Sequence, residues 1–345
     1  MSKILFYSSQ YKCPEVTLPF QLPLFDVFCG DPVSIVRVSV LFALPSLLSR
    51  LSPVERRIRA ENIVRKVSHD DAPEVRTGIL EVLGEVIYTF KGDPGGPPDD
   101  IVRLFIGEEG RDWCSPESSP YELYSPRNPW SGHSVLPQLA ISINDIQARQ
   151  LRQTSSSPIP TNPPPDSDQA RPLICAFNLP AVALTLGASR WAELRGLYTY
   201  LARSGASKVS QTLAASIGEV ARIIGPEQSR RDLLYRWWDF VRGKDPAVRM
   251  KALEALDMFL QVLDLPDRLR IGTSLEEIWD NHLRGWRERE ILAKRLDQLA
   301  PLFPHNGEVL RTLLKKALRD RTAAVRKAAV ESVSHTFTHN CKSKP

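Results

Sequence analysis

A possible zinc site lies near the C-terminus, where side chains of suitable types follow one another at intervals of four. Glu331, His335 and His339 share one face of an expected helix, and Cys341 lies just beyond them. Carboxylate, imidazole and thiolate groups are the usual zinc ligands in proteins. Such a set also arises by chance in a terminal helix, and we favour that interpretation. The sequence therefore predicts no metal ion and no other cofactor.

Catalytic motifs are the second kind of chemistry considered. The sequence contains no GxxxxGK[ST] or GxGxxG phosphate loop, no GxSxG nucleophile turn and no HExxH metal motif. The remaining histidines are scattered, and surface or capping roles explain them. We therefore expect a protein that is not an enzyme and has no small-molecule substrate.

A recurring pattern of an acidic residue, a short turn and a Val-Arg pair offers recognition of anions, because guanidinium groups bind carboxylates and phosphates. Its copies are Asp31 to Arg37, Asp70 to Arg76, Asp245 to Arg249 and Asp320 to Arg326. The two charged residues are six positions apart in three copies and four apart in the Asp245 copy. Repetition in register favours a structural ladder, in which each arginine lies near an aspartate of its own or the next repeat. A row of arginines that binds anions is the alternative.

The spacing of this pattern predicts the elements that carry it. Arg37 and Arg76 are 39 positions apart, and Arg249 and Arg326 are 77 apart, which corresponds to two such periods. A degenerate copy is expected between the last two, in the helix that starts at Trp286. The chain is therefore expected to consist of repeats.

Each copy opens a helix whose apolar residues step by three or four, as a buried helical stripe requires. Two such stripes are Val209, Leu213, Ile217, Val220 and Ile224, and Val248, Ala252, Ala255, Phe259 and Leu263. Amphipathic segments precede the copies at residues 54–67, 191–201, 233–241, 275–283 and 309–318. Two helices per period of about 40 residues are typical of HEAT or armadillo repeats, in which neighbouring pairs stack to bury their stripes. The predicted fold is all-α, a HEAT-repeat α-solenoid of stacked antiparallel helix pairs.

The middle of the chain has a different composition. Between Gly92 and Pro172 lie 14 of the 28 prolines, which packed helices do not tolerate. The predicted organisation is N-terminal HEAT repeats at 1–91, a short helix and a disordered Pro/Ser-rich insertion at 92–171, C-terminal HEAT repeats at 172–339, and a disordered tail at 340–345. Ser-Pro pairs in the insertion are either targets of a proline-directed kinase or chance products of its composition. These serines are Ser115, Ser119, Ser125 and Ser157.

Overall composition argues against a membrane protein and against an obligatory nucleic-acid partner. The mean hydropathy is −0.23, and the longest apolar stretch, residues 38–48, is too short to cross a bilayer. The net charge of +5 comes from 45 basic and 40 acidic residues spread over the chain. Five cysteines, an odd number without a CxxC pair, indicate reduced thiols. We expect a cytoplasmic and/or nuclear protein.

Trp237 and Trp238 form the most distinctive aromatic pair in the sequence. Adjacent residues on a helix diverge by about 100°, so the two rings cannot both face the core, and one is expected to be half exposed. Both are candidates for contact with a partner, and core packing is the simpler interpretation. Trp286, next to Arg287, poses the same choice.

Several short motifs resemble one known family. They are Phe177-Asn178-x-Pro180, Leu184-Thr185-Leu186-Gly187, Trp191-x-Glu193-Leu194-Arg195, Thr212-Leu213-Ala214-Ala215-Ser216 and, earlier, Leu80-Glu81-x-Leu83-Gly84-Glu85. By these motifs the chain resembles the protein phosphatase 4 regulatory subunit 1 family, which is related to the scaffold (A) subunit of protein phosphatase 2A. The chain departs from the repeat pattern at Ser210, which stands where the arginine is expected.

The resemblance implies a non-catalytic regulatory scaffold that binds a catalytic subunit of phosphatase 4 or a 2A-like phosphatase, with room for a further regulatory subunit, and directs it to substrates. In the related scaffolds the catalytic subunit lies on the turns within repeats. Those turns correspond here to residues 204–207, 243–246, 283–286 and 319–322. The resulting contact candidates are Ser204, Ser207, Lys244, Asp245, Arg284, Trp286, Arg319 and Arg321.

Other classes of HEAT protein fit the same repeats. One is an adaptor of the nuclear-transport or cytoskeletal type, and another is a solenoid that associates with nucleic acid through its excess of positive charge. The chain ends within or just after a repeat, which favours a short paralogue or a truncated gene product.

Overall fold

The computed structural model describes residues 18–112, 167–303 and 308–342, and among these residues it contains helices and no strand. The principal helices are α1 (Leu18–Phe28), α2 (Ser34–Leu41), α3 (Leu44–Leu48), α4 (Pro53–Ser68), α5 (Pro73–Tyr88), α6 (Asp99–Asp112), α8 (Ser167–Leu186), α9 (Trp191–Arg203), α10 (Ser207–Ile224), α11 (Pro226–Gln228), α12 (Leu234–Arg242), α13 (Pro246–Glu254), α14 (Leu256–Val262), α15 (Leu265–Asn281), α16 (Trp286–Leu299), α17 (Glu308–Leu318) and α18 (Ala323–Lys342). The predicted all-α class is confirmed.

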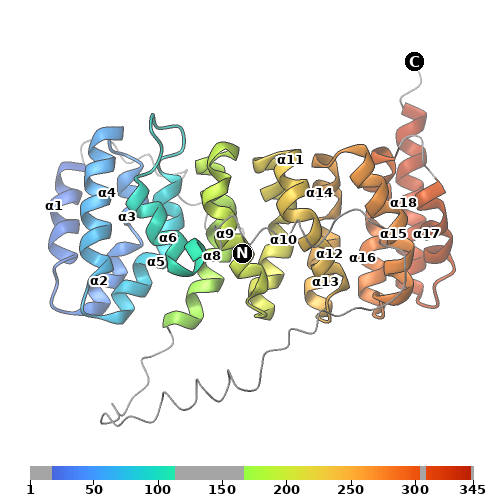
Figure 1. Cartoon of the computed structure of the whole chain (residues 1–345), viewed down its shortest axis with the longest axis horizontal. Helices are drawn as coiled ribbons and strands as arrows, with labels where there is room; N and C mark the ends of the chain where they lie inside the picture. Colours follow the sequence, from blue (N-terminus) through green and yellow to red (C-terminus); the bar gives the residue numbers. More distant parts are fainter. Residues whose placement is uncertain (1–17, 113–166, 304–307, 343–345) are drawn as a thin grey trace, which may run out of the picture. The chain divides into compact units, whose positions relative to one another are not determined.

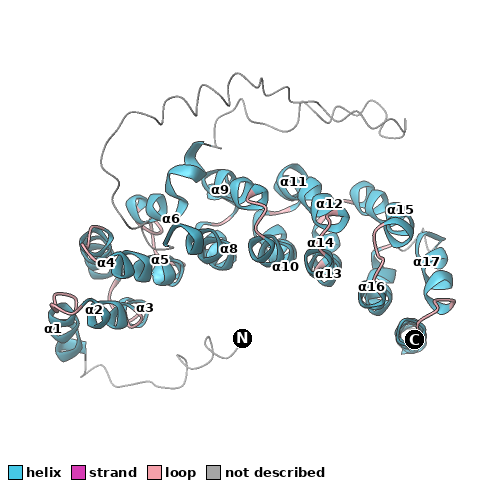
Figure 2. Ribbon diagram, turned by 90° about the horizontal axis from the view of Figure 1, so that it is seen from below, coloured by secondary structure: helices cyan, strands magenta, loops and turns pink. Residues whose placement is uncertain are grey.

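The helices form pairs, and each pair packs on the next (Figure 1). The second helices of the pairs make one row, in which α2 contacts α5, α5 contacts α8, α8 contacts α10, α10 contacts α13, α13 contacts α16, and α16 contacts α18. The first helices make another row, with α4 on α6, α6 on α9, and α15 on α17 (Figure 2). Packing in series, without a single closed core, confirms the predicted α-solenoid.

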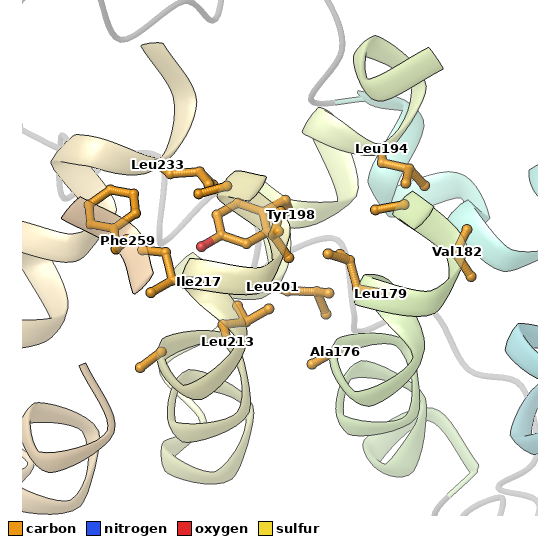
Figure 3. Close-up of a cluster of buried hydrophobic side chains, with 14 of the residues drawn as sticks. Ala176, Leu179, Val182, Leu194, Tyr198, Leu201, Leu213, Ile217, Leu233 and Phe259 are labelled. Atoms are coloured by element: carbon orange, nitrogen blue, oxygen red, sulfur yellow. The ribbon is translucent and has the colours of Figure 1, made fainter. Parts of the chain in front are cut away.

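The helix α10 shows why the repeat folds. Its predicted stripe, from Val209 to Ile224, is almost completely buried, and the helix stops at Gly225, whose φ of 86° is open to glycine. Figure 3 shows how Leu213 of α10 meets Leu179 of α8 and Leu201 of α9 in one apolar cluster. A single pair could not bury these side chains, so stacking supplies the core.

The second predicted stripe is broken where we expected one continuous helix. Ala255, with φ −91° and ψ 0°, separates α13 from α14 and is half exposed, whereas Val248 and Phe259 are buried. The neighbouring helix α10 comes very close at this point: a Cβ on Gly218 would lie 2.8 Å from Cβ of Met258. The prediction of one helix is therefore wrong at Ala255.

The described helices extend beyond two of the expected boundaries. The helix α6 packs on α4 and α9 and so is part of the array, and α8 begins at Ser167, five residues before the expected start at 172. The helix α18 continues to Lys342, into the expected tail at 340–345. The Ser-Pro sites at 115, 119, 125 and 157 lie outside the described residues.

Candidate functional site

The candidate site is built from the turns between the two helices of successive pairs. These are the turns that the resemblance predicted, at residues 204–207, 243–246, 283–286 and 319–322. We call them the turn ridge. Bonds between neighbouring turns join them in order, from Ser207 to Asp245, from Arg249 to Glu288 and from Arg289 to Asp320. The four turns therefore follow one another along one side of the array.

Carboxylates at the ends of the turns start the second helices. In each of four turns an aspartate oxygen accepts a hydrogen bond from the backbone N–H two residues later, at 2.8 to 2.9 Å; these aspartates are Asp31, Asp70, Asp245 and Asp320. Proline follows at the first helical position of α5 and α13, where its missing N–H costs nothing. The acidic residue of the repeat is thus a helix-starting residue.

The arginine of each repeat holds its own turn. In every case Nη1 donates to the carbonyl oxygen of the residue six positions earlier: Arg37 to Asp31, Arg76 to Asp70, Arg249 to Gly243, Arg289 to Leu283 and Arg326 to Asp320. This contact explains the separation of six in the sequence pattern. The Asp245 copy departs from that separation because its carbonyl partner is Gly243, two residues before the aspartate.

Three of these arginines, Arg37, Arg249 and Arg289, also reach the acidic residue of the following repeat. Arg37 binds both carboxylate oxygens of Asp70, with Nη2 to Oδ1 at 2.7 Å and Nε to Oδ2 at 2.9 Å. The hydrogen bond from Arg37 is the main cause that lowers the pKa of Asp70. The structure therefore shows a ladder across this pair of repeats, as the repeated register suggests.

Two further rungs are buried. Arg249 Nε lies 2.6 Å from Glu288 Oε1, and Arg289 Nε lies 2.6 Å from Asp320 Oδ2. Burial alone would raise the pKa of Asp320. Hydrogen bonds from Arg289 and from the backbone of Thr322 lower this pKa and outweigh the effect of burial, so the net shift is downward. Glu288 is only 2% exposed, and its ion pair with Arg249 is therefore buried.

Other rungs differ from the expected pattern. Ser210 replaces the arginine of its repeat, and the contact to the next turn is made instead by the Ser207 hydroxyl, which donates to Asp245 and is the main cause that lowers the pKa of that carboxyl group. Arg76 and Arg326 reach only turn carbonyls among the described residues.

Glu288 and Arg289 were missed in the sequence, although Arg289 lies 40 positions after Arg249 and 37 before Arg326. That spacing is the signal that would have found it. The acid of this repeat is a glutamate inside the helix instead of an aspartate in the turn, and its Oε2 accepts the N–H of Gly285 at 2.7 Å. Glu288 therefore provides the carboxylate of this repeat, although the sequence pattern of Asp and Val-Arg is absent.

The exposed part of the ridge is basic. Lys244, Arg284, Arg319 and Arg321 are all exposed, and none forms an ion pair with another described residue. Ser204 is also exposed, with its hydroxyl bonded to Leu201 O at 2.8 Å. The acidic residues of the same turns, by contrast, are engaged in the ladder, so the ridge presents cations to solvent.

The aromatic candidates separate into two kinds. Trp286 is 38% exposed on the ridge, and the guanidinium of Arg287 lies 4.6 Å from its ring centre. Trp238 is half buried, with the guanidinium of Arg242 at 4.6 Å. Both remain candidates for contact.

Trp237 is not a candidate for contact with a partner. It is fully buried, and its Nε1 donates to Ala252 O at 3.2 Å, so the prediction that it contacts a partner is wrong. Its ring packs edge-on against Trp238, with centroids 5.0 Å apart. The neighbouring helix α13, which supplies the carbonyl, decides which of the two tryptophans faces inward.

Metal and membrane sites are not found in the described part of the chain. No group of three His, Cys, Asp or Glu side chains there is arranged to hold a metal ion. The side chains of His335, His339 and Cys341 lie outside the described set. Within the same residues no single helix is long and apolar enough to cross a membrane, and the one bent pair that passes by length, residues 170–203, turns by 116°.

Comparison with known proteins agrees with the motifs. Residues 175–278, from α8 to α15, match the family model of the protein phosphatase 4 regulatory subunit 1 middle domain. The chain is also 36% identical over 164 residues to the serine/threonine-protein phosphatase 4 regulatory subunits 1 of Homo sapiens, Mus musculus and Rattus norvegicus. The match covers 46% of this chain and 17% of each of these relatives, so the chain corresponds to a small part of their length. The resemblance predicted from the motifs is confirmed.

Proposed function

We propose that this chain is a non-catalytic regulatory subunit of a serine/threonine protein phosphatase, which binds a phosphatase 4-like or 2A-like catalytic subunit on the turn ridge and directs it to substrates. The relatives it resembles are named as regulatory subunits of phosphatase 4. The match to the family model includes two turns of the ridge, because it runs from residue 175 to residue 278. A further regulatory subunit is compatible with this assembly, which we place in the cytoplasm, the nucleus or both.

One observation carries the assignment of the ridge. The ladder engages the carboxylates of Asp245, Glu288 and Asp320, and it leaves basic side chains exposed on the turns 243–246, 283–286 and 319–322. A partner with an acidic face is therefore attracted over several consecutive repeats. Trp286 adds an exposed aromatic ring of the type that often anchors an interface.

Binding to purified catalytic subunits tests the proposal. We expect the chain to bind the catalytic subunit of phosphatase 4 or 2A, with an affinity that falls as salt rises, since exposed charges are screened. A variant that carries Lys244→Glu, Arg284→Glu and Arg321→Glu is expected to bind at least about tenfold more weakly, because three favourable charges become unfavourable. The chain alone should hydrolyse no phosphopeptide.

The matched control reverses three charges away from the ridge, with Arg222→Glu, Lys294→Glu and Lys327→Glu on the outer faces of second helices. It has the same net charge as the ridge variant and is expected to bind normally. Absence of binding to both catalytic subunits would overturn the proposal. If both variants bound the catalytic subunit equally weakly, the turn ridge would not be the binding surface.

A nucleic-acid partner is the second candidate, and the exposed cations of the ridge favour it too. It predicts that a single-stranded or duplex oligonucleotide binds the chain with a steep loss of affinity as salt rises. Oligonucleotide binding that the ridge variant abolishes, together with no binding to either catalytic subunit, would replace the phosphatase assignment.

A further inference from the structure

The outer face of α8 is apolar. No charged side chain occurs on the chain between Arg171 and Arg190. Leu173, Phe177 and Leu184, at steps of four and seven, lie on one helix face and are exposed by 39%, 71% and 41%. Single exposed apolar residues are ordinary, but several on one face of one helix mark a surface that another molecule covers. We call these three residues the α8 stripe.

Carboxylates border the α8 stripe on the side of α5. The two helices cross closely, because a Cβ on Gly84 would lie 2.5 Å from the side chain of Asn178. Asn178 Nδ2 donates to Glu81 O at 3.4 Å, which places the backbone of Glu81 beside Asn178, the residue that follows Phe177. Glu81 and Glu85 are exposed and form no ion pair with another described residue. The side of α5 next to the stripe is therefore acidic.

We propose that the α8 stripe and its bordering carboxylates Glu81 and Glu85 form a docking surface for a partner segment that carries apolar anchors flanked by Lys or Arg. The apolar anchors cover Leu173, Phe177 and Leu184, and the basic residues meet the carboxylates of α5. This surface has the opposite charge to the turn ridge and lies on the outer faces of second helices. It therefore selects a different segment from the one that the ridge binds.

Two synthetic peptides test this surface. One is a 14-residue fluorescent peptide of Leu and Lys, with Leu at helical spacing, and the other has Glu in place of every Lys. We expect the whole chain to bind the basic peptide and not the acidic one. Phe177→Ser should weaken binding at least about tenfold, as loss of a central aromatic anchor does. Glu81→Lys with Glu85→Lys should weaken it as well.

The control is Phe42→Ser, which removes another exposed phenylalanine, 54% accessible, at the end of α2. It should leave peptide binding unchanged, and both serine variants should keep the melting temperature of the parent, since neither ring is buried. Failure of the basic peptide to bind, equal binding of the two peptides, or equal effects of Phe177→Ser and Phe42→Ser would each overturn the inference. Binding of the phosphatase catalytic subunit should survive Phe177→Ser, so this test and that of the proposed function fail independently.

Discussion

At the level of single residues, Arg37, Arg249 and Arg289 each make two kinds of contact with one planar group. One nitrogen donates to a carbonyl oxygen of the preceding turn, and another reaches the acid of the next repeat, as in Arg249 with Gly243 and Glu288. Arginine suits this position because its rigid fork donates in several directions at once, which a lysine does not. The separation of six in the sequence therefore reflects the hydrogen bond of the arginine to its own turn. The acidic residue reflects the packing of one repeat on the next.

Removal of a buried rung should be costly. We expect Arg249→Ala to lower the free energy of unfolding by about 3–5 kcal/mol, because it leaves the Glu288 carboxylate buried without its cation. Urea denaturation of the whole chain measures this. Arg76→Ala is the matched control, since exposed Arg76 contacts only turn carbonyls among the described residues, and its cost should be about 1 kcal/mol. Similar losses in both variants would contradict the role given to Glu288.

Acid should weaken the ladder. The native-state pKa of Asp70 is lowered by its bond to Arg37, so this carboxylate stabilises the fold above the unfolded-state pKa of about 4, and the contribution is lost as pH falls through the native value. We expect the melting temperature of Asp70→Asn to change less between pH 5 and pH 2 than that of the parent chain.

The control for this experiment is Asp71→Asn, next in the chain, whose side chain takes no part in the Arg37 contact. Its pH profile should follow the parent. A profile of Asp70→Asn that falls as steeply as the parent's on the acid side would show that the Arg37 contact contributes nothing to stability.

At the level of helices, sequence periodicity predicted most of what the structure shows, and the failures have one cause. The stripe from Val209 to Ile224 is buried as its spacing requires, because the core needs only that the helix have one apolar face. The break at Ala255 could not be predicted from its own segment, since it coincides with the close approach of Gly218 from another helix. The burial of Trp237 rather than Trp238 is likewise decided by a neighbour.

Gly218 should tolerate no larger side chain. We expect Gly218→Leu to lower the free energy of unfolding by about 1–3 kcal/mol, because its Cβ alone would lie 2.8 Å from Cβ of Met258. Arg222→Leu, one turn later on the exposed side of α10, introduces the same side chain without that contact and should be nearly neutral. Thermal and urea denaturation compare the two. An equal or smaller loss for Gly218→Leu would contradict the close approach of α14 to α10 at Met258.

At the level of the whole molecule, the ladder divides the charges of the chain. Acidic turn residues pair with the arginines between repeats, and the cations that remain, such as Lys244 and Arg321, face solvent on the ridge. The net charge of +5 gave no sign of this division, because it sums paired and unpaired groups alike. The turns themselves were predicted from the resemblance, whereas their basic character became clear only when the partners of the acids were known.

Hydrogen–deuterium exchange of the chain with and without the phosphatase catalytic subunit tests the central claim most directly. We predict slower exchange in peptides that contain residues 204–207, 243–246, 283–286 and 319–322, and unchanged exchange on the outer face of α8, around Phe177. Protection confined to other segments, or no protection at saturating catalytic subunit, would contradict the claim that this array binds a phosphatase through its turn ridge.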